Sequence, residues 1–283
     1  ARAIASSGLI AGGSDVSLNA ATIQSGATIA AGLARDGTLT RSGNLAITSS
    51  GSTTLRGLMA AHDAVQIQGS TVALSGEVSG ASVAMAGSTI SNSGNIRTSG
   101  ALGINGSSLT NSGLIAGQDV QLALSGGLNN ATGLIQSAGN LNIGAGNLDN
   151  SDGEIEAVGS AIINATSIIN DRGRLIVTGP GNLALTSSGN ISSIDGLIGG
   201  NGDVSVRAAS VNVSGANGAI VAGRNLAVTS STIGVDGGAA LRAGGDARLV
   251  ATNALTANAG TIEAGGLLDV ETASATASGG SLL

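Results

Sequence analysis

Small aliphatic residues alternate with polar ones in short segments of this chain, and the segments recur at a nearly constant interval. Leu102 and Ile104 follow Ile96 at six and eight positions. Aliphatic residues fill the same two offsets after Ile10, Ile135, Ile198, Ile220 and Ile262. Alternation at every second position is the period of a β-strand, and no window carries the i, i+3, i+4, i+7 pattern of an amphipathic helix. We therefore expect two or three short strands in each repeat, joined by turns of Gly, Asn and Ser.

A Gly-x-Ile or Gly-x-Leu sequence marks each repeat. The intervals between marker glycines, from Gly94 to Gly260, are 19, 20, 20, 20, 23, 22 and 42 residues, and the last spans two repeats with a degenerate copy near Gly238. One repeat buries about four or five aliphatic side chains at roughly 1.5–3 kcal/mol each, which does not offset a backbone ordering cost of about 1–2 kcal/mol per residue. Each repeat must therefore stack on its neighbours. We predict an all-β fold, a right-handed parallel β-helix (β-solenoid) of about 13 coils with 19–22 residues per coil.

An asparagine recurs in phase with the marker glycines. The positions are Asn92, Asn111, Asn130, Asn150 and Asn170, at intervals of 19, 19, 20 and 20 residues. Residues one period apart lie above one another in a stacked coil, so these side chains are expected to form a hydrogen-bonded ladder at one corner, where Asn tolerates left-handed dihedral angles. The glycines that follow are expected to supply positive φ: Gly94, Gly113, Gly133 and Gly153. This pattern predicts a structural ladder and not a binding site.

The composition narrows the possible functions. There is no Phe, Tyr, Trp or Cys among 283 residues, so the core is built from small aliphatic side chains without disulfides or thiolate metal sites. Hydrophobic residues make up 42% and charged residues 10%, the opposite of a disordered chain. The net charge of −6, with only 11 cationic residues, argues against nucleic-acid binding. No apolar run is long enough to span a membrane.

Two motifs invite a chemical interpretation that their context does not support. His62 is the only histidine and precedes Asp63, but neighbours on a strand point to opposite faces, and a single histidine leaves most metal and acid–base schemes without a partner. The glycine-rich segment 199–204 resembles a calcium-binding nonapeptide, which requires tandem copies that are missing here. We expect a solvated turn histidine and a glycine-rich corner, with no metal and no cofactor.

Paired carboxylates raise the possibility of an enzyme. Glu154 and Glu156 flank Ile155 and would share the outward face of one strand, and polysaccharide-degrading enzymes also include β-helices. Such enzymes carry clustered acids with cations, and aromatic side chains that stack on sugar rings, whereas this chain has no aromatic residue. We therefore interpret the two glutamates as a solvated strand face and expect no enzymatic activity.

One repeat is irregular. The apolar partners of Ile29 are Leu45 and Ile47, at 16 and 18 positions instead of six and eight. About ten residues, 34–43, must therefore leave the coil as a loop. Insertions in solenoids often serve as binding loops. This one offers Arg35, Asp36 and Arg41 as candidate contacts for a partner.

The repeat resembles the haemagglutinin repeats of filamentous haemagglutinin-like exoproteins, the secreted partners of two-partner secretion systems. Their unit of about twenty residues has the form aliphatic-x-Asn-x-x-Gly-x-Ile. Residues 109–117 (LTNSGLIAG), 128–136 (LNNATGLIQ) and 148–157 (LDNSDGEIEA) follow it. The resemblance is clearest over residues 86–272, although copies after residue 185 lose the asparagine, as at Ser193.

This resemblance implies a structural role. It implies that residues 1–283 are one β-helix segment, cut from a longer filamentous protein that is secreted to the surface of a Gram-negative-type bacterium through an outer-membrane partner. Such a shaft mediates adhesion to host or neighbouring cells through a receptor that remains to be identified. Two alternatives stay open: the stick of a contact-dependent growth-inhibition toxin, and a β-helix whose own face binds a carbohydrate or receptor.

Overall fold

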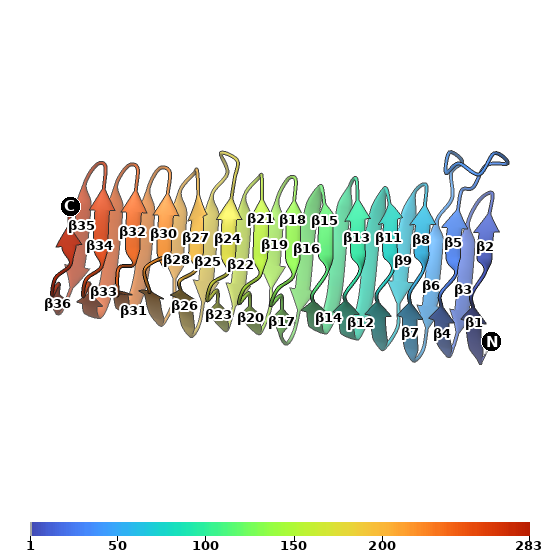
Figure 1. The fold of residues 1–283 in the computed structure, drawn as a ribbon, viewed down its shortest axis with the longest axis horizontal. Helices are drawn as coiled ribbons and strands as arrows, with labels where there is room; N and C mark the ends of the chain where they lie inside the picture. Colours follow the sequence, from blue (N-terminus) through green and yellow to red (C-terminus); the bar gives the residue numbers. More distant parts are fainter. Residues whose placement is uncertain (1) are drawn as a thin grey trace. The chain divides into compact units, whose positions relative to one another are not determined.

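The computed structural model describes residues 2–283, which form β-strands and turns and contain no helix that could cross a membrane. The chain divides into two compact units, each a stack of parallel turns (Figure 1). Unit 1 comprises Ala1–Leu128 and Leu134–Ala138, and unit 2 comprises Asn129–Gly133 and Gly139–Leu283. The prediction of an all-β parallel solenoid is confirmed.

Each complete turn carries three strands, which we assign to three faces. Face I is the 14-stranded sheet, with one strand per turn beginning near the marker glycine. Faces II and III belong to the second sheet: face II carries the aliphatic pair at offsets six and eight, and face III precedes the next marker glycine. Since face I has fourteen strands, the chain has one turn more than the expected number of about 13.

The strands of unit 1 follow this three-face plan in chain order. They are β1 (Ala3–Ser6), β2 (Leu9–Gly12), β3 (Val16–Ala20), β4 (Thr22–Ser25), β5 (Thr28–Ala31), β6 (Leu45–Ser49), β7 (Ser52–Leu55), β8 (Leu58–Ala61), β9 (Ala64–Gln68), β10 (Thr71–Leu74), β11 (Glu77–Gly80), β12 (Ser82–Asn92), β13 (Asn95–Thr98), β14 (Ala101–Asn111), β15 (Leu114–Gly117), β16 (Asp119–Leu124) and β18 (Leu134–Ser137). β12 and β14 run through faces II and III without a break, and β17 (Leu128–Asn129) contains the unit boundary.

Unit 2 repeats the same three-face plan. Its strands are β19 (Leu141–Gly144), β20 (Asn147–Asp149), β21 (Glu154–Ala157), β22 (Ala161–Ala165), β23 (Ser167–Ile169), β24 (Arg174–Val177), β25 (Leu183–Ser187), β26 (Asn190–Ile194), β27 (Leu197–Gly200), β28 (Val204–Arg207), β29 (Ser210–Ser214), β30 (Ala219–Ala222), β31 (Leu226–Asp236), β32 (Ala240–Ala243), β33 (Ala247–Thr256), β34 (Thr261–Ala264), β35 (Leu268–Thr272), β36 (Ala275–Thr276) and β37 (Ser281–Leu282).

Aliphatic side chains one period apart are paired in register. In unit 1, Ile96 pairs with Ile115, and Ile115 pairs with Ile135; in unit 2, Ile155 pairs with Leu175. All of these side chains are fully buried. The core is therefore a set of stacked aliphatic columns, in which each turn covers the apolar surface that its neighbour would otherwise expose to water.

The marker glycines are required by close contact between turns and not by backbone dihedral angles, which corrects the expectation of positive φ at these positions. A Cβ atom on Gly113 would overlap the carbonyl oxygen of Gly94, and a Cβ on Gly153 would overlap that of Asn130. Positive φ falls instead on the preceding residue in the turns that are one residue longer: Thr132 (62°), Asp152 (55°) and Arg172 (54°). The extra residue is thus accommodated in a left-handed conformation.

Candidate functional site

The buried asparagines lie on the strand ends of face III and bond from turn to turn. Asn92 Nδ2 donates to Asn111 Oδ1 at 2.7 Å, Asn130 to Asn150 at 2.7 Å, and Asn150 to Asn170 at 2.8 Å. Each side chain is at most 1% exposed. None of them has positive φ, so the expectation of left-handed asparagines is wrong.

The same column changes character at both ends. Toward the N-terminus its positions are Leu55 and Leu74, and Leu74 pairs in register with Asn92. Toward the C-terminus Asn170 donates to the buried Ser193 Oγ at 3.4 Å, and Val213 then takes the position. Across residues 2–283 no buried side-chain nitrogen or oxygen lacks a hydrogen-bond partner. These amides stabilise the interior and offer nothing to a ligand.

A second, exposed column of polar side chains was not anticipated from the sequence. In unit 2 the residue just before each face II strand accepts a hydrogen bond from the backbone N–H of its counterpart in the next turn, at 2.8–3.2 Å. The accepting residues are Asn140, Ser160, Asn182, Asp203, Asn225 and Asp246. The sequence signal that could have predicted this column is an Asn, Asp or Ser directly before the aliphatic pair of each repeat.

Residues 32–44 leave the coil between β5 and β6 and form the projecting loop seen beside β5 in Figure 1. Leu33 and Leu39 form an antiparallel bridge, and Arg41 N donates to the Gly32 carbonyl at 3.0 Å. The segment therefore has internal structure.

The three candidate contact residues are all exposed but have different surroundings. Asp36 Oδ1 accepts bonds from the Thr38 hydroxyl (2.6 Å) and the Thr38 amide (3.0 Å), which lower the pKa of the carboxyl below its usual value. Arg41 lies over Gly13 of the preceding turn. Within residues 2–283, neither Arg35 nor Arg41 takes part in an ion pair.

His62 and Asp63 do bond to one another, contrary to the sequence argument, because β8 ends at Ala61 and both residues lie in the following turn. His62 Nδ1 is 2.6 Å from Asp63 Oδ1, and Asp63 Oδ2 accepts from Ser42 Oγ (2.5 Å) and Gly43 N (3.0 Å). The Ser42 hydroxyl, followed by His62, lowers the pKa of Asp63. The carboxylate stands between serine and histidine, whereas nucleophilic catalysis needs the histidine between them. This cluster holds the end of the inserted segment.

The two glutamates of β21 have partners in the next turn. Glu154 Oε1 is 3.2 Å from Arg174 Nε, and Glu156 Oε1 accepts from Thr178 Oγ1 at 3.1 Å. They are therefore components of cross-turn pairs on face I, not a free pair of carboxylates.

The glycine-rich segment 199–204 also has a structural explanation. Gly199 leaves an apolar notch between Ile176 and Val221 on face I, and Asp203 bonds to Asn225 of the next turn. Among residues 2–283 no three His, Asp or Glu side chains are grouped as metal ligands.

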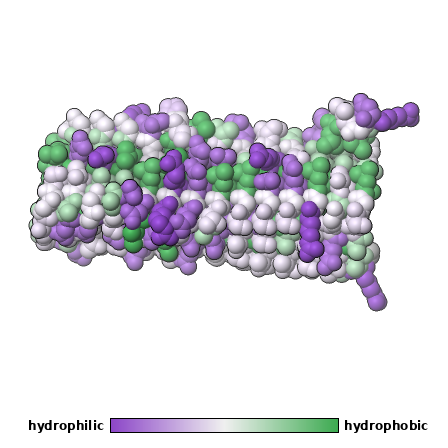
Figure 2. All heavy atoms as spheres, viewed as in Figure 1, coloured by the Kyte–Doolittle hydropathy of each residue, from purple (hydrophilic) through white to green (hydrophobic). Residues whose placement is uncertain are grey.

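In unit 2, several arginines form ion pairs with acids one turn away. Figure 2 shows strongly hydrophilic side chains as separate groups among pale, small residues on the face in view. Arg172 makes two 2.8 Å bonds to the carboxylate of Asp152, and this contact lowers the pKa of Asp152. Arg224, Arg242 and Arg248 pair with acids one turn away. Exposed pairs of this kind contribute little individually.

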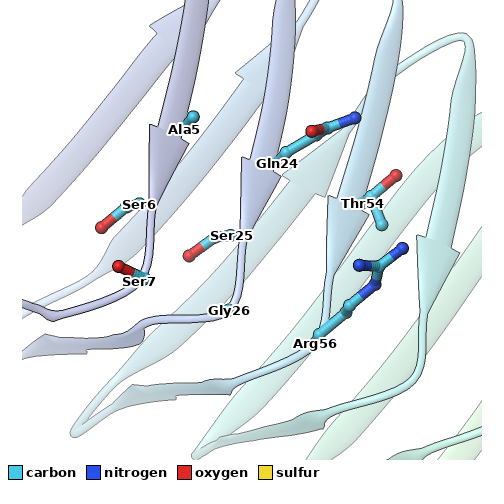
Figure 3. A pocket seen from close by; sticks show the side chains of 8 residues that line it. All are labelled: Ala5, Ser6, Ser7, Gln24, Ser25, Gly26, Thr54 and Arg56. Atoms are coloured by element: carbon cyan, nitrogen blue, oxygen red, sulfur yellow. The ribbon is translucent and has the colours of Figure 1, made fainter.

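A groove of about 340 Å³ with a mixed polar and apolar lining opens on the first turns of unit 1, where face III ends (Figure 3). Arg56 projects beside it from the end of β7, and Gln24 extends toward the strand that carries Thr54. The remaining lining residues are Ala5, Ser6, Ser7, Ser25 and Gly26. This groove combines a concave surface with an arginine that has no ion pair among residues 2–283, and it was not predicted from the sequence.

Comparison with known proteins identifies the repeat. The haemagglutinin repeat family matches residues 1–57 and 60–130. Curated proteins and solved structures gave no match.

Proposed function

Since the chain contains a filamentous haemagglutinin-type repeat region, we propose that it is a shaft segment of a secreted, surface-exposed bacterial exoprotein that mediates adhesion. The observation that carries this proposal is the uniformity of the fold. Every turn of both units repeats one plan, and the recurring asparagines and glycines of the repeat, such as Asn111 and Gly113, act between turns. A shaft needs this, because each added turn contributes the same contacts.

The geometry also supports a role without catalysis. The histidine is bonded to a carboxylate that holds a loop, and the glutamates of β21 are paired across turns. A filamentous haemagglutinin-type shaft would reach the cell surface through an outer-membrane secretion partner. Its receptor on host or bacterial cells would be bound elsewhere in the longer protein or by the inserted segment 34–43.

The test is surface display and adhesion in the producing bacterium. Antibodies raised against residues 2–283 should label intact cells, and labelling should disappear when the outer-membrane partner is deleted. Deletion of the exoprotein should reduce attachment to host cells. Labelling confined to permeabilised cells would refute the proposal, and loss of growth inhibition toward neighbouring bacteria, with attachment unchanged, would support the toxin-stick alternative instead.

The inserted segment can be tested separately. Joining Leu33 to Asn44 leaves a three-residue connection between β5 and β6, the same length as residues 13–15 between β2 and β3. Deleting residues 34–43 should therefore leave the fold intact. If the deletion and the Arg35→Ala/Arg41→Ala double variant both reduce attachment to the same level, the contact is assigned to this loop. Unchanged attachment of the deletion variant would end that assignment.

A further inference from the structure

The groove in unit 1 exists because one position in the column of residues that follow the face III strands carries no side chain. The residue directly after each face III strand is equivalent from turn to turn, since its N–H bonds to the preceding turn in the same way. These residues are Ser7, Gly26, Arg56, Ser75, Ser93 and Ser112. Unlike the marker glycines, Gly26 has no atom within 4 Å of where a Cβ would lie. The space between Ser7 and Arg56 is therefore open to a ligand.

Arg56 supplies an uncompensated positive charge at this groove. It is exposed, and among residues 2–283 it takes part in no ion pair, whereas Arg172, Arg174 and Arg224 are all paired with acids one turn away. A guanidinium presents two parallel N–H groups that match the two oxygens of a carboxylate. The guanidinium of Arg56 can therefore bind one anionic group in this groove.

The rest of the lining includes five neutral side chains that can form hydrogen bonds, those of Ser6, Ser7, Gln24, Ser25 and Thr54, together with Ala5 and Gly26. Ser7, Gln24 and Thr54 make no side-chain hydrogen bond within residues 2–283, and Ser25 Oγ accepts one bond, from Ala27 N at 3.1 Å. Hydroxyl groups donate and accept, and a carboxamide does both with separate atoms. These groups complement a ligand that is itself rich in hydroxyls, and the volume falls within the range of about 300–1,000 Å³ found for small-molecule sites.

We propose that this groove binds a carboxylate-bearing sugar residue, with the carboxylate on Arg56 and the ring hydroxyls on Gln24, Thr54 and Ser7. A single cation favours a monoanionic sugar over a polyanion. Because no aromatic side chain is present to stack on the ring, a single sugar should bind weakly, with a Kd on the order of 1 mM. The biological use of the site rests on the proposed surface exposure, because the sugar would be presented by another cell.

The binding experiment uses the 283-residue chain labelled with ¹⁵N and three probes: methyl glucuronide, methyl glucoside and acetate. Methyl glucuronide should shift the amide resonances of residues 5–7, 24–26 and 54–56 saturably. Methyl glucoside and acetate should each bind at least tenfold more weakly, because methyl glucoside lacks the carboxylate and acetate lacks the sugar hydroxyls. Equal binding of either probe, or no saturation by the glucuronide at about 50 mM, would overturn the proposal.

Two variants and one matched control locate the site. Arg56→Gln removes the charge, and Gly26→Leu fills the open space; each should weaken glucuronide binding at least tenfold while circular dichroism and melting temperature stay unchanged. Arg97→Gln removes an equally exposed, unpaired arginine of β13 and should bind like the wild type. Wild-type affinity in Arg56→Gln would refute the assignment. Attachment that survives Arg56→Gln on whole cells would refute the use of the groove while leaving the proposed shaft function standing.

Discussion

Asn150 illustrates how a polar side chain stabilises an interior made of small aliphatic residues. Its Nδ2 donates to Asn170 Oδ1 (2.8 Å) and to the Arg174 carbonyl (3.0 Å), while its Oδ1 accepts from Asn130 (2.7 Å). A buried amide is costly only when its groups lack partners. The amide of Asn150 bonds to the turns on both sides, so it links neighbouring turns and also fixes their register.

Replacing Asn150 by Ala should therefore lower the free energy of unfolding by about 2–4 kcal/mol, because it removes these bonds and leaves a small cavity. Urea denaturation of the chain measures the loss. Asn164→Ala is the matched control, since Asn164 lies exposed on β22 and should cost no more than about 0.5 kcal/mol. Equal effects of the two substitutions would contradict a stabilising ladder.

The marker glycines make a separate prediction. A Cβ on Gly173 would overlap the carbonyl oxygen of Asn150. This oxygen belongs to the backbone and the Cβ is bonded directly to Cα, so neither atom can move away by a side-chain rotation. Gly173→Ala should cost about 3 kcal/mol or more, because adjacent turns must move apart. Gly234→Ala in the same unit should be nearly neutral, since its nearest neighbours are 3.4–3.5 Å away. Thermal unfolding of both variants will show whether glycine is required by close contact between turns or only by the local backbone conformation.

At the scale of strands and turns, the ion pairs lie on the surface and respond to pH. Arg172 lowers the pKa of Asp152 below its ordinary value of 3.8, so deprotonation of Asp152 favours the folded state. The contribution of the pair should be fully present above about pH 4 and disappear as the pH falls through the lowered pKa. Melting temperatures of wild type and Arg172→Gln should differ slightly near neutral pH and converge in acid.

The control for this pH dependence is Arg207→Gln. Arg207 is exposed on β28 and has no ion pair among residues 2–283, so its removal should not produce a difference that disappears in acid. A wild-type/Arg172→Gln difference that persisted below the pKa of Asp152 would mean that packing of the arginine stem, and not charge, is responsible.

The strand pattern was predictable because it follows from period alone, whereas the turns were not. The spacing of Ile96, Leu102 and Ile104 is enough to predict strands on two faces. The dihedral angles depend on where an additional residue enters the turn: Asp152 takes the left-handed conformation because Gly153 must face the preceding turn without a side chain. Sequence shows which residue types are present at a turn, but contacts from the neighbouring turn determine which of them adopts which conformation.

At the scale of the whole molecule, we expect the chain to tolerate deletion of one complete turn but not deletion of part of a turn. Deleting residues 154–173 joins Gly153 to Arg174. Arg174 pairs in register with Glu154 of the preceding turn, so it takes the place of the residue that normally follows Gly153. This deletion should give a folded protein with wild-type circular dichroism. Deleting only residues 154–163 removes β21 and most of β22 and moves the face III strand β23 toward the face I position, so that variant should aggregate or unfold. A folded half-turn variant would contradict the stacked register.

The ligand groove shows why a site in a solenoid is harder to predict than the fold. Ser7, Gln24 and Arg56 come from three successive turns, and the interval between the last two is lengthened by the inserted segment. From the sequence Arg56 is one solvated charge among eleven cationic residues. Its significance depends on the open space at Gly26 and on the missing acidic partner, and both are properties of neighbouring turns.

The order of the turns along the chain determines how each unit would respond to mechanical load. Turns that are consecutive in sequence are bonded to one another, and no disulfide joins distant turns. A pulling force on the chain ends would therefore peel turns off one at a time, and each turn of about 20 residues would release roughly 65 Å of extended polypeptide. In the proposed adhesive role, an attached cell under flow would then be held by a tether that lengthens in steps before it breaks.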